Sequence, residues 1–166
     1  MEFFKQTNRI TNKWTKTTAE AFGNTPAVRR GRAGELLIID ALRSWGWEVV
    51  DHERNRAKQV KHIDIEFRSP TWAHFYSGSI KSNMDDDQNI FVYDEWIHDT
   101  NTDRIFHSNP TTGWFCWYDT TNMKSFFRYN KDNIKTSGNG RRYLKVTPYM
   151  GSRWIKYRKH GEGYAY

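Results

Sequence analysis

The stretch "KHIDIEFRSPTWAHFYSGSIKS", residues 61–82, decides the fold that the sequence predicts. Its two halves, "HIDIEF" and "AHFYSGSIKS", are typical of strands, and the "RSPT" between them is typical of a turn. Side chains two residues apart share one face of a strand, so Asp64 and Glu66 point the same way. If the strands are antiparallel neighbours, Lys81 approaches both carboxylates.

A long helix is predicted before this stretch. Thr25 can cap it, Pro26 suits its first position, and Gly46 ends it after Trp45. Glu35 lies close to the apolar side of this helix rather than opposite it. That side carries Leu37, Ile38, Ala41, Leu42 and Trp45.

The remaining elements predict an α/β (α+β) fold, a mixed β-sheet flanked by helices. We expect a single domain with an N-terminal helical segment (1–25), a core (26–135) and a basic aromatic C-terminal segment (136–166). The expected smaller elements are a helix at 7–22, a strand at 47–53, a basic connection at 54–61, strands at 89–96 and 113–119, a helix that starts near Thr120 or Thr121 and carries Ile134, and late strands at 142–149 and 152–159 as a hairpin.

The net charge of +7 is unevenly distributed. Lys and Arg concentrate after residue 123, where they alternate with aromatic residues, as in "SRWIKYRKHGEGYAY". Cations can neutralise phosphates while rings stack on bases, so this composition favours nucleic-acid binding. A solvated basic surface over an aromatic core is the alternative.

Several function classes are disfavoured by the sequence. No apolar run approaches membrane-spanning length, and the N-terminus lacks a signal-peptide core. The single cysteine, Cys116, fits a buried thiol in a reducing cytoplasm and cannot supply a zinc site. "GRAGE" lacks the Lys-Ser/Thr of a phosphate-binding loop. The acidic run 85–87 is expected to be a solvated loop, and His62 to be polar surface.

The carboxylates of the opening stretch suit a hard divalent cation, Mg²⁺ or Mn²⁺. Such a cation stabilises charge on a phosphate, and a neighbouring lysine can assist attack by water. Asp64 and Glu66 are the expected metal ligands, Glu35 adds a third carboxylate, and Lys81 is the expected catalytic lysine. Surface ion pairs would also explain all four residues.

The order of Glu35 on a helix, Asp64 on a strand and Lys81 on the next strand resembles the PD-(D/E)XK nuclease superfamily. The resemblance implies an αβββαβ core, a metal-binding role for Asp64 and a catalytic role for Lys81. It matches Glu35 to an acid that many members carry on the first helix. Ser79 departs from the acidic position of the motif, and Glu66 is the candidate for a relocated acid. His62-Ile63 stands in place of the signature proline.

The resemblance implies a Mg²⁺-dependent DNA endonuclease of the phage, recombination or homing kind. RNA remains an alternative substrate, and a homodimer would serve a double-strand cut. A non-catalytic nucleic-acid-binding protein on the same scaffold is the second hypothesis, which Ser79 would permit. The expected contacts to the nucleic-acid backbone are Arg29, Arg30, Arg32, Arg141, Arg142, Arg153, Lys156, Arg158 and Lys159.

Overall fold

The computed structural model describes residues 25–98 and 101–151, together with the backbone of 158–159. Its elements are α2 (Pro26–Ser44), β1 (Glu48–Asp51), α3 (Arg56–Val60), β2 (Ile65–Arg68), β3 (Tyr76–Lys81), β4 (Ile90–Tyr93), α4 (Asp94–His98), β5 (Arg104–Asn109), β6 (Trp114–Asp119), α5 (Thr120–Tyr129), a 3-10 turn (Lys131–Asn133), β7 (Lys135–Thr136), β8 (Arg142–Val146), α6 (Pro148–Gly151) and β9 (Arg158–Lys159). The helix expected at 7–22 lies outside the described residues.

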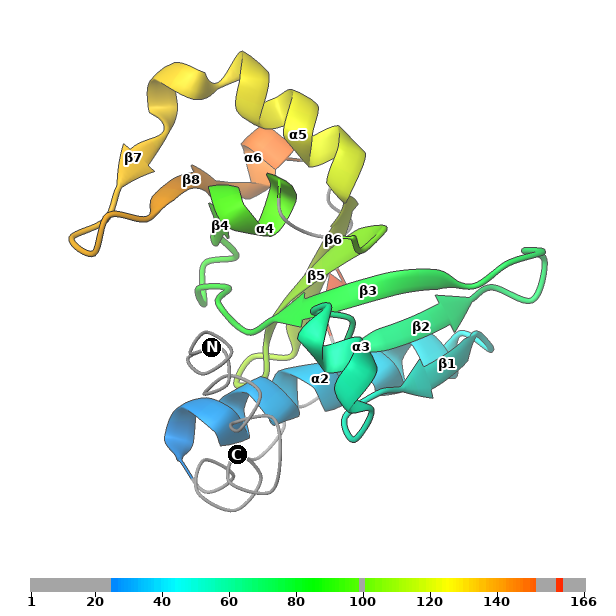
Figure 1. Ribbon diagram of the computed structural model, residues 1–166. Helices are drawn as coiled ribbons and strands as arrows, with labels where there is room; N and C mark the ends of the chain where they lie inside the picture. The colour runs from blue at the N-terminus through cyan, green and yellow to red at the C-terminus, as the bar shows by residue number, and fades with distance from the viewer. Residues whose placement is uncertain (1–24, 99–100, 152–157, 160–166) are drawn as a thin grey trace, which may run out of the picture.

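Two sheets form the framework (Figure 1). The larger has the strand order β1-β2-β3-β5-β6-β9, and the smaller has the order β4-β8-β7. In the larger sheet, β3 and β5 run parallel while the other neighbours are antiparallel. The predicted fold class, a mixed sheet flanked by helices, is confirmed. None of the helices in the described ranges is long and apolar enough to cross a membrane.

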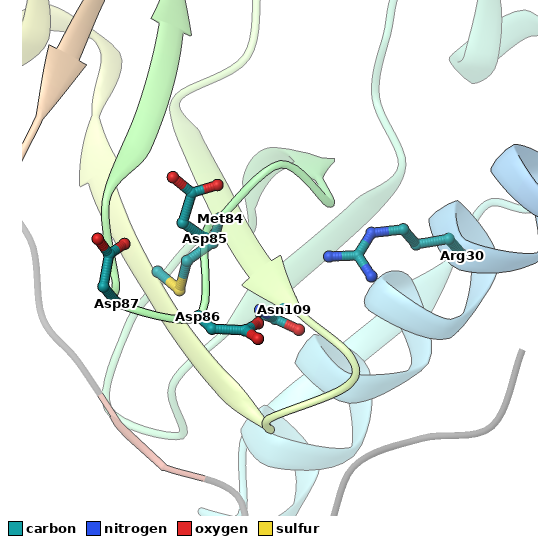
Figure 2. Close-up of a pocket in the computed structure, with 6 residues that line it drawn as sticks. All are labelled: Arg30, Met84, Asp85, Asp86, Asp87 and Asn109. Atoms are coloured by element: carbon teal, nitrogen blue, oxygen red, sulfur yellow. Dashed lines mark hydrogen bonds between the residues drawn. The ribbon is translucent and has the colours of Figure 1, made fainter.

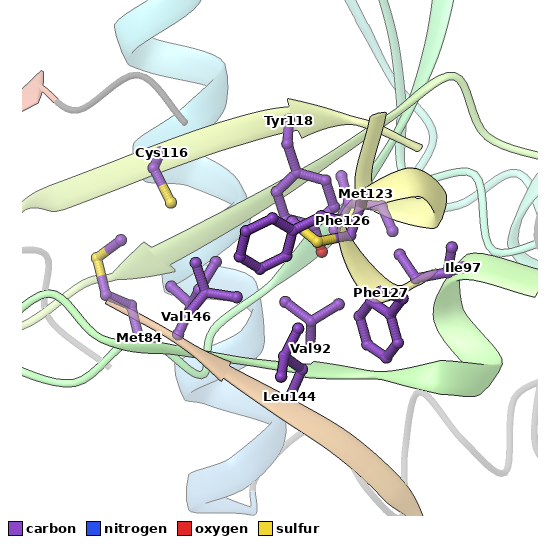
Figure 3. Close-up of a cluster of buried hydrophobic side chains, with 12 residues drawn as sticks. Met84, Val92, Ile97, Cys116, Tyr118, Met123, Phe126, Phe127, Leu144 and Val146 are labelled. Carbon is purple, nitrogen blue, oxygen red and sulfur yellow. The ribbon is translucent and has the colours of Figure 1, made fainter. Parts of the chain in front are cut away.

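The larger sheet separates two hydrophobic cores. On one face, α2 packs its buried residues against Ile65, Phe67, Ile80 and Phe106. On the other face, α4, α5 and the smaller sheet enclose a second cluster, which Figure 3 shows around Tyr118. Alternate residues of the central strands therefore serve opposite cores.

Helix α2 follows its sequence signals closely. The Thr25 hydroxyl accepts a hydrogen bond from the Val28 amide at 3.2 Å, and Pro26 begins the helix. Trp45 is the C-cap, and Gly46 follows with a φ of 82°, where a residue without Cβ is favoured. The predicted helix and its apolar face are confirmed.

Other local predictions need correction. The strand β5, which lies in the middle of the larger sheet, was not predicted, and the connection 54–61 contains the short helix α3. The strand expected at 89–96 ends at Tyr93, where α4 begins with two acidic residues that suit a helix N-terminus.

The end of the chain also differs from its prediction. The helix that begins at Thr120 ends at Tyr129, before Ile134. The hairpin of 142–149 with 152–159 is wrong, because β8 pairs with β4 and β7 whereas β9 pairs with β6. The late strands therefore belong to different sheets.

Gly34 sets how closely α2 approaches the larger sheet. A Cβ at this position would lie 1.9 Å from Ser82 Oγ and 2.5 Å from Ser108 Oγ. Gly31, one turn earlier, has nothing within 4 Å of such a Cβ. Of the two glycines in α2, Gly34 is therefore the one that close packing requires, and it directly precedes Glu35.

We expect Gly34→Ala to lower the free energy of unfolding by about 1–3 kcal/mol, because the added methyl group forces α2 away from two serines. Gly31→Ala is the matched control and should raise the free energy by up to about 1 kcal/mol through helix propensity. Urea denaturation of both variants measures the difference. Equal stabilisation by both substitutions would contradict the close approach.

Candidate active site

Asp64 lies at the point where β2 and β3 separate. Their pairing reaches Ile65 and Gly78, and beyond it the Ile80 amide donates to Asp64 Oδ2 at 2.6 Å. The Ser79 hydroxyl lies 3.4 Å from the same oxygen. Burial raises the pKa of Asp64, while the Ile80 amide, Lys81 and Ser79 oppose that rise. The chain thus holds a partly buried carboxylate at the end of the strand pair.

Glu35 reaches the same region from α2. Burial, followed by the negative charge of Asp64, raises the pKa of Glu35 to about 7. Arg32 opposes this rise, with Nη1 at 2.8 Å from Glu35 Oε1. The two carboxylates are therefore close enough to repel each other, as carboxylates that share one site do.

Lys81 supplies a cation beside this acidic pair. Burial, together with the charge of Arg141, lowers the pKa of Lys81 below its usual value. The negative charges of Asp64, Glu95 and Glu35 oppose this lowering. Its Nζ lies 4.7 Å from the centre of the Trp96 ring. The structure therefore brings together Glu35, Asp64 and Lys81, the three residues that the sequence order singled out.

Arg32 joins three carboxylates around the site. Besides Glu35, its guanidinium contacts Asp51 at 2.6 Å and Glu53 at 3.4 Å. Burial alone would raise the pKa of Asp51, but the hydrogen bonds from Arg32 and the Glu53 amide, together with the charges of Arg32 and Arg43, lower that pKa. Arg32 thus bridges α2 and the end of β1, and its contact with a nucleic-acid backbone remains a prediction.

Glu66 has different partners. Its Oε1 lies 2.7 Å from His52 Nε2 and 3.3 Å from Lys58 Nζ. Burial opposes the effect of His52 and Lys58, but these two partners prevail and lower the pKa of Glu66. Although Glu66 shares a strand with Asp64, its contacts tie it to β1 and α3. A metal-binding role for Glu66 remains a prediction.

The other basic residues that the sequence singled out are dispersed. Arg30 donates to the Ser82 carbonyl at 3.3 Å, and Arg141 pairs with Glu95 at 2.8 Å. Arg142 lies 3.8 Å from Asp94. Arg29 lies in the first turn of α2. Arg153 and Lys156 lie outside the described residues, and only the backbone of Arg158 and Lys159 is described.

Two features of the site were missed from the sequence. Asp51 at the end of β1 joins the acidic group through Arg32, and its charge contributes to the raised pKa values of Glu35 and Asp64. His107, the register partner of Lys81 in β5, is fully buried and contacts Tyr118 Oη at 2.8 Å. Burial, followed by the charge of Lys81, lowers the pKa of His107 to about 3, so it is neutral beneath the lysine.

The acidic run 85–87 lies apart from these residues. Figure 2 shows it beside a hollow that is also lined by Arg30, Met84 and Asn109. The three aspartates are exposed, and Asn109 donates to Asp86. The expected solvated loop is confirmed.

The donor set near Asp64 is compatible with a magnesium ion. Mg²⁺ retains several waters and takes only one or two protein carboxylates, which Glu35 and Asp64 provide. Their mutual repulsion, evident in the pKa of Glu35, is what a divalent cation would relieve. Among the described residues, no three His, Cys, Asp or Glu side chains group as a ready-made metal site.

Comparisons with known proteins do not assign the chain to a family. No family model matches the chain, and no curated protein matches it. Among solved structures, the chain is similar to a nuclease from a fusselovirus, with a TM-score of 0.45 and 16% sequence identity. The alignment covers 78% of this chain and 86% of that chain.

We expect Glu35→Gln to change how stability depends on pH. With a pKa near 7 when folded and an ordinary value of 4.5, Glu35 holds a proton in the folded state that the unfolded state has lost. Its contribution to stability therefore falls as the pH rises between these values. The Gln variant lacks this loss and should gain about 1–3 kcal/mol relative to wild type from pH 4.5 to pH 8.

Glu66→Gln is the control, because the pKa of Glu66 is lowered on folding. Glu66 stabilises the fold above its ordinary pKa, and this stabilisation is lost as the pH falls through the folded value, so its replacement should cost more at high pH. Urea unfolding at several pH values measures both variants. Parallel stability profiles for wild type and Glu35→Gln would contradict the raised pKa of Glu35.

Proposed function

We propose that the protein is a Mg²⁺-dependent endonuclease that hydrolyses phosphodiester bonds in DNA, with a PD-(D/E)XK type of site. One observation carries the proposal: Asp64, held at the separation of two strands, interacts electrostatically with both Glu35 and Lys81. Two carboxylates that can hold a metal ion, with a lysine near them, suit metal-assisted hydrolysis of a phosphodiester bond.

Each residue has a distinct proposed role. Asp64 and Glu35 would hold the ion, which supplies Lewis-acid stabilisation of charge on the scissile phosphate. Lys81 faces the same phosphate and stabilises the negative charge that develops on it, or orients the attacking water. Arg32 acts as a positioning residue, because it fixes Glu35 relative to Asp51.

Basic residues are the proposed contacts with the nucleic-acid backbone. They are Arg29, Arg30, Arg32, Arg141 and Arg142 among the described residues, and Arg153, Lys156, Arg158 and Lys159 in the C-terminal segment. Their contacts with phosphates would release counterions, so binding should weaken steeply with salt. A homodimer would allow a double-strand cut.

We expect purified protein with Mg²⁺ or Mn²⁺ to nick or cut supercoiled plasmid, and EDTA to abolish the reaction. Asp64→Asn and Lys81→Ala should each slow cleavage by about 100-fold or more, the scale of losing one catalytic electrostatic contact. Glu66→Gln should slow it by less than about tenfold, since Glu66 contacts His52 and Lys58.

Gel electrophoresis of plasmid, linear duplex, single-stranded and branched DNA measures these rates. If wild type and both variants leave every form intact while still binding it, the non-catalytic nucleic-acid-binding alternative holds instead. If Glu66→Gln slowed cleavage as much as Asp64→Asn does, the result would indicate that Glu66 also binds the metal ion.

Metal binding should also appear without any substrate. A ligand that binds only the folded state stabilises it, so Mn²⁺ should raise Tm by several degrees at concentrations well above its Kd. Asp64→Asn should reduce this rise, whereas Asp87→Asn in the exposed acidic loop should leave it unchanged. Thermal unfolding with and without Mn²⁺ measures the shift, and an equal rise in all three proteins would contradict the site.

A further inference from the structure

A row of aromatic rings, the aromatic stripe, runs from Lys81 across the smaller sheet. It comprises Trp96 in α4, Tyr93 and Phe91 in β4, and Tyr143 in β8. Successive ring centres are 4.8 Å apart for Trp96 and Tyr93, 5.9 Å for Tyr93 and Tyr143, and 6.0 Å for Tyr143 and Phe91. The Trp96 end lies 4.7 Å from Lys81 Nζ, so the stripe begins at the candidate active site.

The register of the smaller sheet places Phe91, Tyr93 and Tyr143 on its outer face, whereas Trp96 packs against the buried cluster. Tyr93 pairs with Tyr143 and Phe91 with Lys145, so these four side chains share one face. The intervening residues of both strands face the hydrophobic cluster of Figure 3. Unlike that cluster, the rings of Phe91, Tyr93 and Tyr143 are partly exposed. The core therefore does not account for them.

Cations accompany the rings. The Arg141 guanidinium lies 3.8 Å from the centre of the Tyr93 ring, and Glu95 holds it through Nη2 at 2.8 Å. Lys145 Nζ lies 5.8 Å from the Phe91 ring, and Lys135, the register partner of Tyr143, is exposed on the same face. Glu95 and Asp94 are the acidic residues nearby, and Arg141 and Arg142 offset them.

We propose that the aromatic stripe is a stacking surface for single-stranded nucleic acid, which it leads toward Lys81. Base faces stack on aromatic rings and on arginine planes, while lysines beside them neutralise phosphates. Paired bases in a duplex hide their faces, so the preferred ligand is an unpaired stretch. The inference rests on the proposed function for its direction toward Lys81, but the binding itself needs no catalysis.

The test measures fluorescence anisotropy of labelled oligonucleotides in EDTA, so that no cleavage occurs. The probes are a 15-mer of thymidine, the matching abasic 15-mer with the same phosphates, the equivalent uridine 15-mer and a duplex of equal length. Wild type should bind the thymidine 15-mer at least about tenfold more tightly than the abasic one, the scale of one stacked base. The uridine probe distinguishes DNA from RNA as the source of the bases.

Variants locate the stacking. Tyr143→Leu and Phe91→Leu should each weaken binding of the thymidine 15-mer by about tenfold and leave the abasic 15-mer unaffected. Tyr143→Phe should retain tight binding because it keeps the ring. Tyr129→Leu is the matched control, since Tyr129 is 83% exposed at the end of α5 and is not one of the stripe residues.

Three results would overturn the inference: equal affinity for the thymidine and abasic probes, base-dependent binding that both leucine variants retain, or no nucleic-acid binding at all. The last result would favour a protein partner for the rings. Plasmid cleavage without base-dependent binding would contradict only the proposed stacking surface. Base-dependent binding without cleavage of any substrate in Mg²⁺ would contradict only the proposed endonuclease activity.

Discussion

The repulsion between Glu35 and Asp64 is the constraint on which the candidate site depends. Burial, followed by the negative charge of Asp64, raises the pKa of Glu35 to about 7, so both effects disfavour the ionised form of this carboxylate. The fold offsets this cost with cations on both sides, Arg32 toward α2 and Lys81 toward β3. A core does not need such an arrangement for stability, because apolar residues would fill the space at lower electrostatic cost. The presence of both acids therefore fits the proposed site, in which their negative charge would hold a cation.

Backbone features bring these charges together. Gly34 lets α2 approach the larger sheet, which sets the depth at which Glu35 sits. Because β2 and β3 separate at this point, the Ile80 amide has no carbonyl partner in β2. It donates its hydrogen bond to the Asp64 carboxylate instead. Beneath Lys81, His107 stays neutral and buried, so it adds no charge that would repel the ammonium group. The geometry of the site thus follows from one helix packing distance and one strand end.

Local sequence signals predicted the parts of this arrangement that depend on periodicity. Capping residues marked α2, and alternation marked β2 and β3, so the order of Glu35, Asp64 and Lys81 could be placed in advance. The strand β5 was missed because its second half, from His107 to Asn109, is polar yet buried, which hides the usual apolar signal. Local patterns do not encode contacts between residues that are far apart in the sequence. These contacts include the parallel pairing of β5 with β3, the Arg32 bridge to Asp51, and the placement of β8 and β9 in separate sheets.

Ser79 has a physical explanation within the same constraint. It is 2% exposed and lies against Asp64, where an acidic side chain would add a further buried negative charge to a pair that already repels. The serine hydroxyl donates to Asp64 and so favours its ionised form, which is the form that binds a cation. In the proposed site, Glu35 on the helix would supply the second carboxylate without an acid at position 79. Ser79, where the resembling motif has an acid, is thus compatible with the proposed site, because Asp64 and Glu35 still provide two carboxylates.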